Sequence, residues 1–154
     1  MKLTPLSGLG TVAMVVGDAL RRAGIHAVLT GGAYLAMEAI GFARRGDRYV
    51  HRQVRFYVEF PRGPLAIGND YRIRPVERKT AYARTLILSA TDSCRDRLAA
   101  FYHWGDRQSL RVAVRIATAN KVSLAKIRRW SIDEGAREAF NHFADELNRA
   151  RARK

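Results

Sequence analysis

A strand, a sharp turn and a helix are predicted within Ala27-Val28-Leu29-Thr30-Gly31-Gly32-Ala33-Tyr34-Leu35-Ala36. The apolar and β-branched residues that lead up to Thr30 favour a short buried strand, and the two glycines permit a turn that other residues disfavour. Backbone N–H groups at such a turn, with the N-terminus of the following helix, can bind an anion. Gly31 and Gly32 are therefore candidate phosphate-binding residues, with a plain sharp turn as the alternative.

Helices and strands are predicted on both sides of this turn. Apolar residues at helical spacing predict helices over residues 9–23 and 33–40. Apolar runs and alternating patterns predict strands at 26–30, 48–51 and 54–60, with one or two more between 71 and 89, the best at 85–89. The sequence therefore predicts an α+β fold with a small mixed or antiparallel sheet.

The last third of the chain is predicted to be helical. Thr91 or Asp92 can cap a helix that ends at Trp104-Gly105, and further helices are expected to begin near Asp106 and at Ser123. The spacing in Ser131-Ile132-Asp133-Glu134 is that of a capping box and predicts the start of a fourth helix. We expect a single domain over residues 1–154, with an α/β core at 1–90, C-terminal helices at 91–148 and a frayed basic tail at 149–154.

The composition is strongly basic, with 28 Lys and Arg residues against 14 Asp and Glu residues and a net charge of +14. Such an excess indicates a polyanionic partner, although a solvated basic surface is an alternative. Between residues 44 and 84, eleven basic residues accompany four acidic ones. RNA, DNA or a nucleotide is the expected partner. The candidate nucleic-acid-binding residues are Arg44, Arg45, Arg48, Arg52 and Arg55.

Cys94 is the single cysteine, which excludes an internal disulfide and an all-cysteine metal site. It also favours a reducing, cytoplasmic compartment. The side chain of Cys94 is expected to pack in the core. The N-terminal residues lack the sustained apolar run of a signal peptide or a membrane span, so no membrane partner is expected.

Glu59 is the candidate metal ligand and catalytic carboxylate. It lies between Val58 and Phe60 on a predicted strand, where a carboxylate can ligate Mg²⁺ or act as a base. The alternative is that Glu59 lies on the polar face and pairs with an arginine such as Arg55. No Asp-x-Asp or Glu-x-Asp pair occurs anywhere in the sequence.

A second group of charged residues surrounds the corner between two predicted helices. Asp96, Arg97, Asp106 and Arg107 can form an ion-pair network or face a nucleotide phosphate. A structural role is the favoured interpretation for Asp96 and Asp106.

Four stretches of the chain carry a family likeness: residues 20–33 (LRRAGIHAVLTGGA), 58–68 (VEFPRGPLAIG), 91–109 (TDSCRDRLAAFYHWGDRQS) and 127–131 (IRRWS). Together they resemble small bacterial members of the DNA polymerase β-like nucleotidyltransferase superfamily. The resemblance implies that Gly31 and Gly32 hold a nucleoside triphosphate. It also implies that Glu59 is one of three carboxylates that bind two Mg²⁺ ions for nucleotidyl transfer.

The chain departs from the family pattern between Ile40 and Arg48. The resemblance implies a strand with paired Asp residues after the glycine helix, but the chain passes directly into Gly41-Phe42-Ala43-Arg44-Arg45-Gly46-Asp47. We expect this strand to be deleted, and we do not expect Asp47 to bind metal. The missing strand would leave a sheet edge that a homodimer could cover.

Two functions are therefore expected from the sequence. The favoured one is a degenerate nucleotidyltransferase-fold protein that binds nucleotide or nucleic acid without metal-dependent catalysis. The alternative is an active, toxin-like nucleotidyltransferase that uses Mg²⁺ and an NTP to modify an RNA or protein acceptor, with an antitoxin as a further partner.

Overall fold

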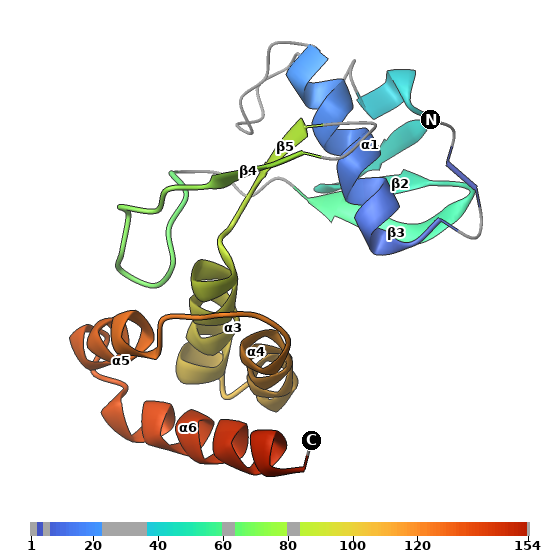
Figure 1. Cartoon of the computed structure of the whole chain (residues 1–154). Helices are drawn as coiled ribbons and strands as arrows, with labels where there is room; N and C mark the ends of the chain where they lie inside the picture. The colour runs from blue at the N-terminus through green and yellow to red at the C-terminus, as the bar shows by residue number, and fades with distance from the viewer. Residues whose placement is uncertain (1–2, 5–6, 23–36, 60–63, 80–83, 154) are drawn as a thin grey trace. The chain divides into compact units, whose positions relative to one another are not determined.

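The structure is a computed structural model that describes residues 3–4, 7–22, 37–59, 64–79 and 84–153 (Figure 1). The chain forms two compact units: Met1–Gly63 with Val76–Ile87, and Pro64–Pro75 with Leu88–Lys154. Helices and small antiparallel sheets occur together, so the predicted α+β class is confirmed. The single domain with its boundary near residue 90, and the nucleotidyltransferase-like arrangement, stay predictions.

The first unit contains the amphipathic helix α1 (Leu9–Arg22). Its apolar residues recur at helical spacing, and Val12 and Val16 are buried, as expected for a helix that covers a core with one face. They form one hydrophobic core with Phe42. The helix predicted over residues 9–23 is thereby confirmed.

A three-stranded antiparallel sheet lies in the same unit, in the order β1-β2-β3. Its strands are β1 (Phe42–Arg45), β2 (Arg48–His51) and β3 (Val54–Glu59). Two-residue turns join them, as is common in hairpins. Gly46 in the first turn has a φ of 63°, a conformation that glycine adopts readily. The strand predicted at 48–51 is confirmed, and the strand predicted at 54–60 is confirmed as far as Glu59, since residue 60 lies outside the described residues.

Strand β1 lies between Ile40 and Arg48, where the sequence patterns predicted no strand. Phe42 is buried and pairs with His51, and the strand continues along β2 as far as Arg45. Pairing with β2 and burial of Phe42 stabilise a strand that the arginine-rich sequence does not suggest. The strand contains no carboxylate. Whether the chain lacks the family's paired-Asp strand stays a prediction, as does a homodimer across the sheet edge.

A second antiparallel sheet consists of β4 (Val76–Lys79) and β5 (Arg84–Ile87), with Val76 paired to Ile87. The two strands confirm the expectation for residues 71–89. The strand predicted at 85–89 ends at Ile87 because Ser89 caps the next helix. Every strand pair in the described ranges is antiparallel. Of the two predicted alternatives, a mixed or an antiparallel sheet, the antiparallel one therefore holds for these strands.

The second unit is helical, as predicted (Figure 1). Its helices are α3 (Ala90–Trp104), α4 (Arg107–Ala119), α5 (Leu124–Asp133) and α6 (Arg137–Ala152). They enclose a core in which Cys94, Leu98, Ile127 and Phe143 are fully buried. Cys94 therefore packs in the core as expected, and burial raises the pKa of its thiol to about 12. No helix in the part of the chain described is both long and apolar enough to cross a membrane.

Side-chain caps fix where these helices begin. The helices expected to begin near Asp106 and at Ser123 are confirmed, and these two residues cap α4 and α5. The cap of α3 is Ser89, not Thr91 or Asp92. Its Oγ accepts a hydrogen bond from the Asp92 N–H at 3.0 Å and donates one to Asp92 Oδ2 at 2.7 Å. The predicted caps Thr91 and Asp92 were wrong because both residues lie inside the first turn of α3, whereas the cap is the residue that precedes the helix.

The predicted capping box at residues 131–134 is wrong. Ser131 lies inside α5, where its Oγ donates to the Ile127 carbonyl at 2.8 Å. Gly135 adopts a φ of 72° and ends that helix, and α6 starts after Ala136 without a side-chain cap. The expected frayed tail is also wrong as far as residue 152, because α6 continues through it. Arg151 Nη2 donates to the Ala117 carbonyl of α4 at 3.3 Å.

Candidate functional site

One face of the three-stranded sheet collects arginines around an exposed tyrosine. In the register, Arg45 pairs with Arg48, which pairs with Glu59 on β3. Directly paired residues share a face of an antiparallel sheet, and residues two apart on one strand share it too. Tyr57 and Arg55 therefore lie on the same side as Glu59. We call these five residues the arginine face.

The opposite face of the sheet is the buried one. Tyr49 and Val54 alternate with residues of the arginine face and are buried in the core of the first unit. The exposed residues of β3, in contrast, are Arg55, Tyr57 and Glu59. The alternation orients the arginine face toward solvent, where it can meet a partner.

Arg48 lies at the centre of the arginine face. Its Cζ lies over the Tyr57 ring, 4.7 Å from the ring centroid, and its Nε is 3.0 Å from Glu59 Oε1. Tyr57 still exposes 52% of its surface. The cation–π contact and the ion pair position the guanidinium while leaving aromatic surface free. A guanidinium group can bind oxyanions, and an exposed aromatic ring can stack with another planar group.

The five predicted nucleic-acid-binding arginines are all exposed, but the sheet brings only some of them together. Arg45, Arg48 and Arg55 share the arginine face. Arg44 pairs with Tyr49, so it lies on the opposite face of the sheet. Its Nε donates to the Gly46 carbonyl at 2.9 Å. Arg52 lies in the turn between β2 and β3.

Glu59 stays a predicted metal ligand and catalytic carboxylate, and the structure shows its ion-pair partner. Its carboxylate pairs with Arg48, which is the alternative that the sequence analysis left open. Mg²⁺ prefers several oxygen ligands in octahedral geometry. The residue paired with Glu59 on β2 is Arg48, whose Nε also lies 3.6 Å from Asp47 Oδ1. Across the described ranges, no group of three or more His, Cys, Asp or Glu residues is placed to hold a metal. Gly31 and Gly32 lie outside the described residues, so their phosphate-binding role stays a prediction.

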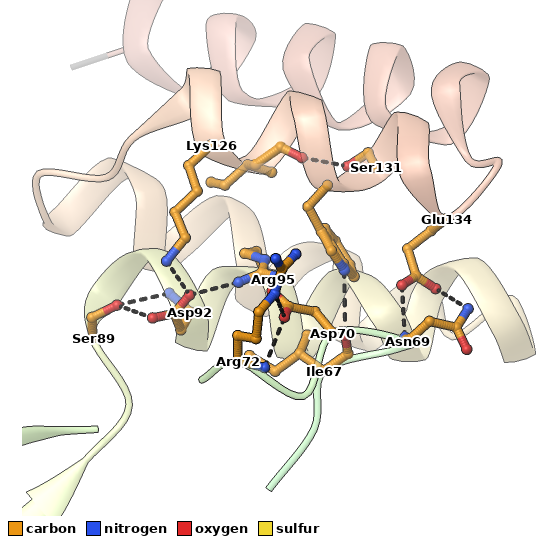
Figure 2. Close-up of polar contacts among 12 residues, drawn as sticks. Ile67, Asn69, Asp70, Arg72, Ser89, Asp92, Arg95, Lys126, Ser131 and Glu134 are labelled. Atoms are coloured by element: carbon orange, nitrogen blue, oxygen red, sulfur yellow. Dashed lines mark hydrogen bonds and ion pairs between the residues drawn. The ribbon is translucent and has the colours of Figure 1, made fainter. Parts of the chain in front are cut away.

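The second unit contains a buried ion-pair network centred on Arg95 (Figure 2). The Arg95 side chain is 1% exposed. Its Nη2 donates to Asp70 Oδ2 at 2.6 Å and its Nη1 to Asp92 Oδ1 at 2.9 Å. Its Cζ lies over the Trp130 ring, 5.0 Å from the centroid. A buried charge needs such partners because desolvation is costly.

Both carboxylates of this network are held in the ionised form. The hydrogen bond from Arg95 lowers the pKa of Asp70, with help from the Arg72 N–H. Burial alone would raise the pKa of Asp92, but hydrogen bonds from Ser89, Lys126 and Arg95 outweigh it, and the pKa is lowered. Lys126 Nζ lies 3.0 Å from Asp92 Oδ1.

The network fixes the segment 67–72 onto α3 and α5. Trp130 Nε1 donates to the Ile67 carbonyl at 3.3 Å. The Asn69 N–H donates to Glu134 Oε1 at 2.7 Å, and Asn69 Nδ2 donates to Glu134 Oε2 at 3.2 Å (Figure 2). Gly68 adopts a φ of 58° between these anchors, and a Cβ there would lie 2.5 Å from the Glu134 carboxylate. A glycine is therefore required for this close approach.

Gly68→Ala should lower the free energy of unfolding of the second unit by about 2–3 kcal/mol. The left-handed φ contributes about 1–2 kcal/mol of this for a residue with a Cβ, and displacement of Glu134 contributes the rest. Gly105→Ala is the matched control, because Gly105 has a φ of 65° in the same unit and open space around it. Urea unfolding followed by tryptophan fluorescence measures both variants, and equal losses would contradict the close approach.

The ion pairs of Asp70 and Asp92 should make the second unit sensitive to acid. Their pKa values are lowered in the folded state, so their contribution is fully present above the unfolded value near 3.8 and is lost as the pH falls through and below it. The urea concentration at the midpoint of unfolding should therefore decrease when the pH is lowered below about 5. Asp92→Asn should flatten this drop, while Asp96→Asn, at an exposed ion pair, should leave it unchanged. An unchanged drop in Asp92→Asn would contradict the assignment.

This network was not predicted from the sequence. For Asp96, Arg97, Asp106 and Arg107 the sequence left open an ion-pair network or contact with a nucleotide phosphate. In the structure, Asp96 and Arg97 form a half-exposed pair with each other. Asp106 caps α4, and its pKa is lowered by the hydrogen bond from Ser109.

A local signal for part of the true network was present in the sequence. Ser89, Asp92 and Arg95 recur at intervals of three residues, which places them on one side of a helix. The partner Asp70 lies 25 residues away from Arg95, so no local spacing indicates it.

A pocket of about 260 Å³ lies between segment 69–72, α3 and α5. Four basic residues line it, Arg72, Arg95, Lys126 and Arg129. The acidic lining residues are Asp70, Asp133 and Glu134, and Asn69 and Trp130 complete the wall. The pocket belongs to the second unit alone.

Comparisons of the chain with protein-family models, with curated proteins and with solved structures found no match. The resemblance to nucleotidyltransferases therefore stays a prediction from the sequence.

Proposed function

We propose that the chain binds single-stranded nucleic acid on the arginine face and does not catalyse nucleotidyl transfer there. The observation that carries the proposal is the placement of Arg48 over the half-exposed Tyr57 ring, with Arg45 and Arg55 on the same face of the sheet. Arginine guanidinium groups bind phosphate oxygens in a bidentate manner. An exposed tyrosine supplies a surface on which an unpaired base can stack.

An open sheet face with an exposed aromatic residue favours a single strand over a duplex. Sheet faces with exposed aromatic residues bind splayed bases, whereas a duplex hides its bases and is read by elements that enter a groove. Adjacent strands are about 4.8 Å apart, so the three strands span a surface suited to a few nucleotides. The net charge of +14 adds long-range attraction for any polyanion.

The ion pair that Glu59 makes with Arg48 is the reason to propose that the chain does not catalyse nucleotidyl transfer. A cation bound there would have to displace the Arg48 guanidinium from its ion pair with Glu59. Two cations competing for one carboxylate repel each other. Incubation with Mg²⁺ or Mn²⁺, labelled nucleoside triphosphates and total RNA should transfer no label. Transfer that Glu59→Ala abolishes would establish the alternative, an active nucleotidyltransferase.

Tyr57→Ala should weaken binding of a fluorescent 12-nucleotide RNA about tenfold or more, because stacking of one base contributes about 1–3 kcal/mol. Tyr57→Phe should bind like the parent chain, since the ring is kept. Tyr71→Ala is the matched control, because Tyr71 is an exposed tyrosine of the second unit. Fluorescence anisotropy measures all three. Equal binding by Tyr57→Ala and the parent chain would remove base stacking from the proposal.

A further inference from the structure

The pocket of the second unit has binding groups that its own network does not use. The buried guanidinium of Arg95 is committed to Asp70 and Asp92, and Lys126 is committed to Asp92. Two other arginines of the lining differ. Arg72 is 96% exposed, with its Nε 3.7 Å from Asp70, and Arg129 has no hydrogen bond or ion pair with any described residue.

Most carboxylates of the pocket already have hydrogen-bond or ion-pair partners within the second unit. Asp70 accepts from Arg95, and Glu134 accepts from Asn69 and lies 3.3 Å from His103 Nε2. Asp133 is the one acidic lining residue that has no hydrogen bond or ion pair within the described ranges. Among the described residues, Arg129 and Asp133 are thus uncommitted, Arg72 has only its long ion pair with Asp70, and the buried Nε of Arg95 has no hydrogen-bond partner.

The geometry points to a binding site for a small molecule that carries a phosphate or carboxylate group. Arg72 comes from segment 69–72 and Arg129 from α5, so the two can hold an oxyanion from different elements. Asp133 can accept a hydrogen bond from a hydroxyl group on the rest of the ligand. The volume of about 260 Å³ is close to the lower limit for small-molecule sites, which favours a compact ligand such as a sugar phosphate or a hydroxy acid.

The walls of the site are fixed before any ligand binds. Segment 67–72 is anchored by the bonds of Ile67, Asn69 and Asp70 to α3 and α5 (Figure 2). A preorganised site spends little of its binding energy on ordering its own groups. The site is independent of the arginine face, which belongs to the first unit.

The test uses the full chain with Trp104→Phe, which leaves Trp130 in the pocket wall as the sole tryptophan. Trp104 is 78% exposed, so its replacement should not disturb the fold. Ribose 5-phosphate, pyrophosphate and citrate are titrated at constant ionic strength. We expect a saturable change in Trp130 emission with at least one probe. The phosphate and carboxylate probes together show which oxyanion the site prefers.

Matched variants locate the binding. Arg72→Ala and Arg129→Ala should each weaken the bound probe about tenfold, whereas Arg74→Ala and Arg128→Ala should leave the affinity unchanged. All four side chains are exposed, and Arg74 and Arg128 do not line the pocket. No saturable change with any probe, confirmed by calorimetry, would overturn the inference. Equal weakening by the control variants would overturn it as well. RNA binding by Tyr57→Ala is a separate readout, so this inference and the proposed function can fail independently.

Discussion

Arg95→Met should destabilise the second unit by about 3–5 kcal/mol, the usual cost of removing one partner from a buried ion pair. Asp70 loses its closest cation, and Asp92 keeps only Lys126 and Ser89 as partners. Both carboxylates are then buried or half-buried with less compensation. Both tryptophans, Trp104 and Trp130, lie in the second unit, so urea unfolding followed by their fluorescence reports on that unit directly.

A second variant shows whether the loss comes from unpaired charge. Asp70→Asn and Asp92→Asn, added to Arg95→Met, should recover part of the stability, because neutral side chains no longer need the cation. Arg97→Met is the control, since its ion pair with Asp96 is half-exposed and should contribute less than about 1 kcal/mol. A loss below about 1 kcal/mol in Arg95→Met would contradict a central role for this residue.

Reversing the charge of the arginine face should weaken RNA binding about 100-fold. The variant carries Arg45→Glu, Arg48→Glu and Arg55→Glu. If each lost phosphate contact costs about 1 kcal/mol, the three together cost about 3 kcal/mol, which corresponds to that factor. The slope of log affinity against log salt should also fall by about 2, because each phosphate contact on a single strand contributes about 0.7. Anisotropy titrations between low and physiological salt measure both quantities.

The control for this variant removes the same charge elsewhere. Arg107, Arg111 and Arg115 are exposed on α4 of the second unit, and their replacement by Glu changes the net charge by the same amount. If nucleic acid binds the arginine face, this control should weaken binding far less than the variant of β1–β3. Equal weakening would mean that attraction comes from net charge alone and would contradict the proposed site.

The sequence predicted the elements that local patterns determine. Helix α1 follows from apolar spacing, and β2 and β3 follow from alternation and a short turn. The caps of α4 and α5, Asp106 and Ser123, follow from side chains that satisfy free backbone N–H groups. Each of these signals acts within one turn or one hairpin, so a single sequence contains it in full.

The errors arose where tertiary contacts override a local pattern. The four residues of β1 look like a basic loop, but Phe42 is buried and the strand pairs with β2. The Ser-x-x-Glu spacing at Ser131 imitates a helix start, but Ser131 bonds backward to Ile127 and continues α5. A cap motif has meaning only at a helix boundary, and Gly135 sets that boundary here.

The candidate sites were predictable to different degrees. The arginine face was partly predictable, since the alternation of β3 places Arg55 and Glu59 on the polar side. Which of the predicted arginines belong to the arginine face depends on the register between the strands, and residue spacing alone does not determine that register. The pocket of the second unit was not predictable, because Asn69 and Glu134 meet across 65 residues.

The decisive measurement for single-strand binding on the arginine face is photocrosslinking of a 4-thiouridine-labelled single-stranded RNA, followed by mass spectrometry of the linked peptides. It identifies the bound surface on the unmodified protein, without any substitution that could alter folding. The proposal predicts crosslinks on β3, with Tyr57 as the principal site, and their loss when unlabelled single strand competes. Crosslinks confined to the helices α3–α6, with none on β1–β3, would contradict it.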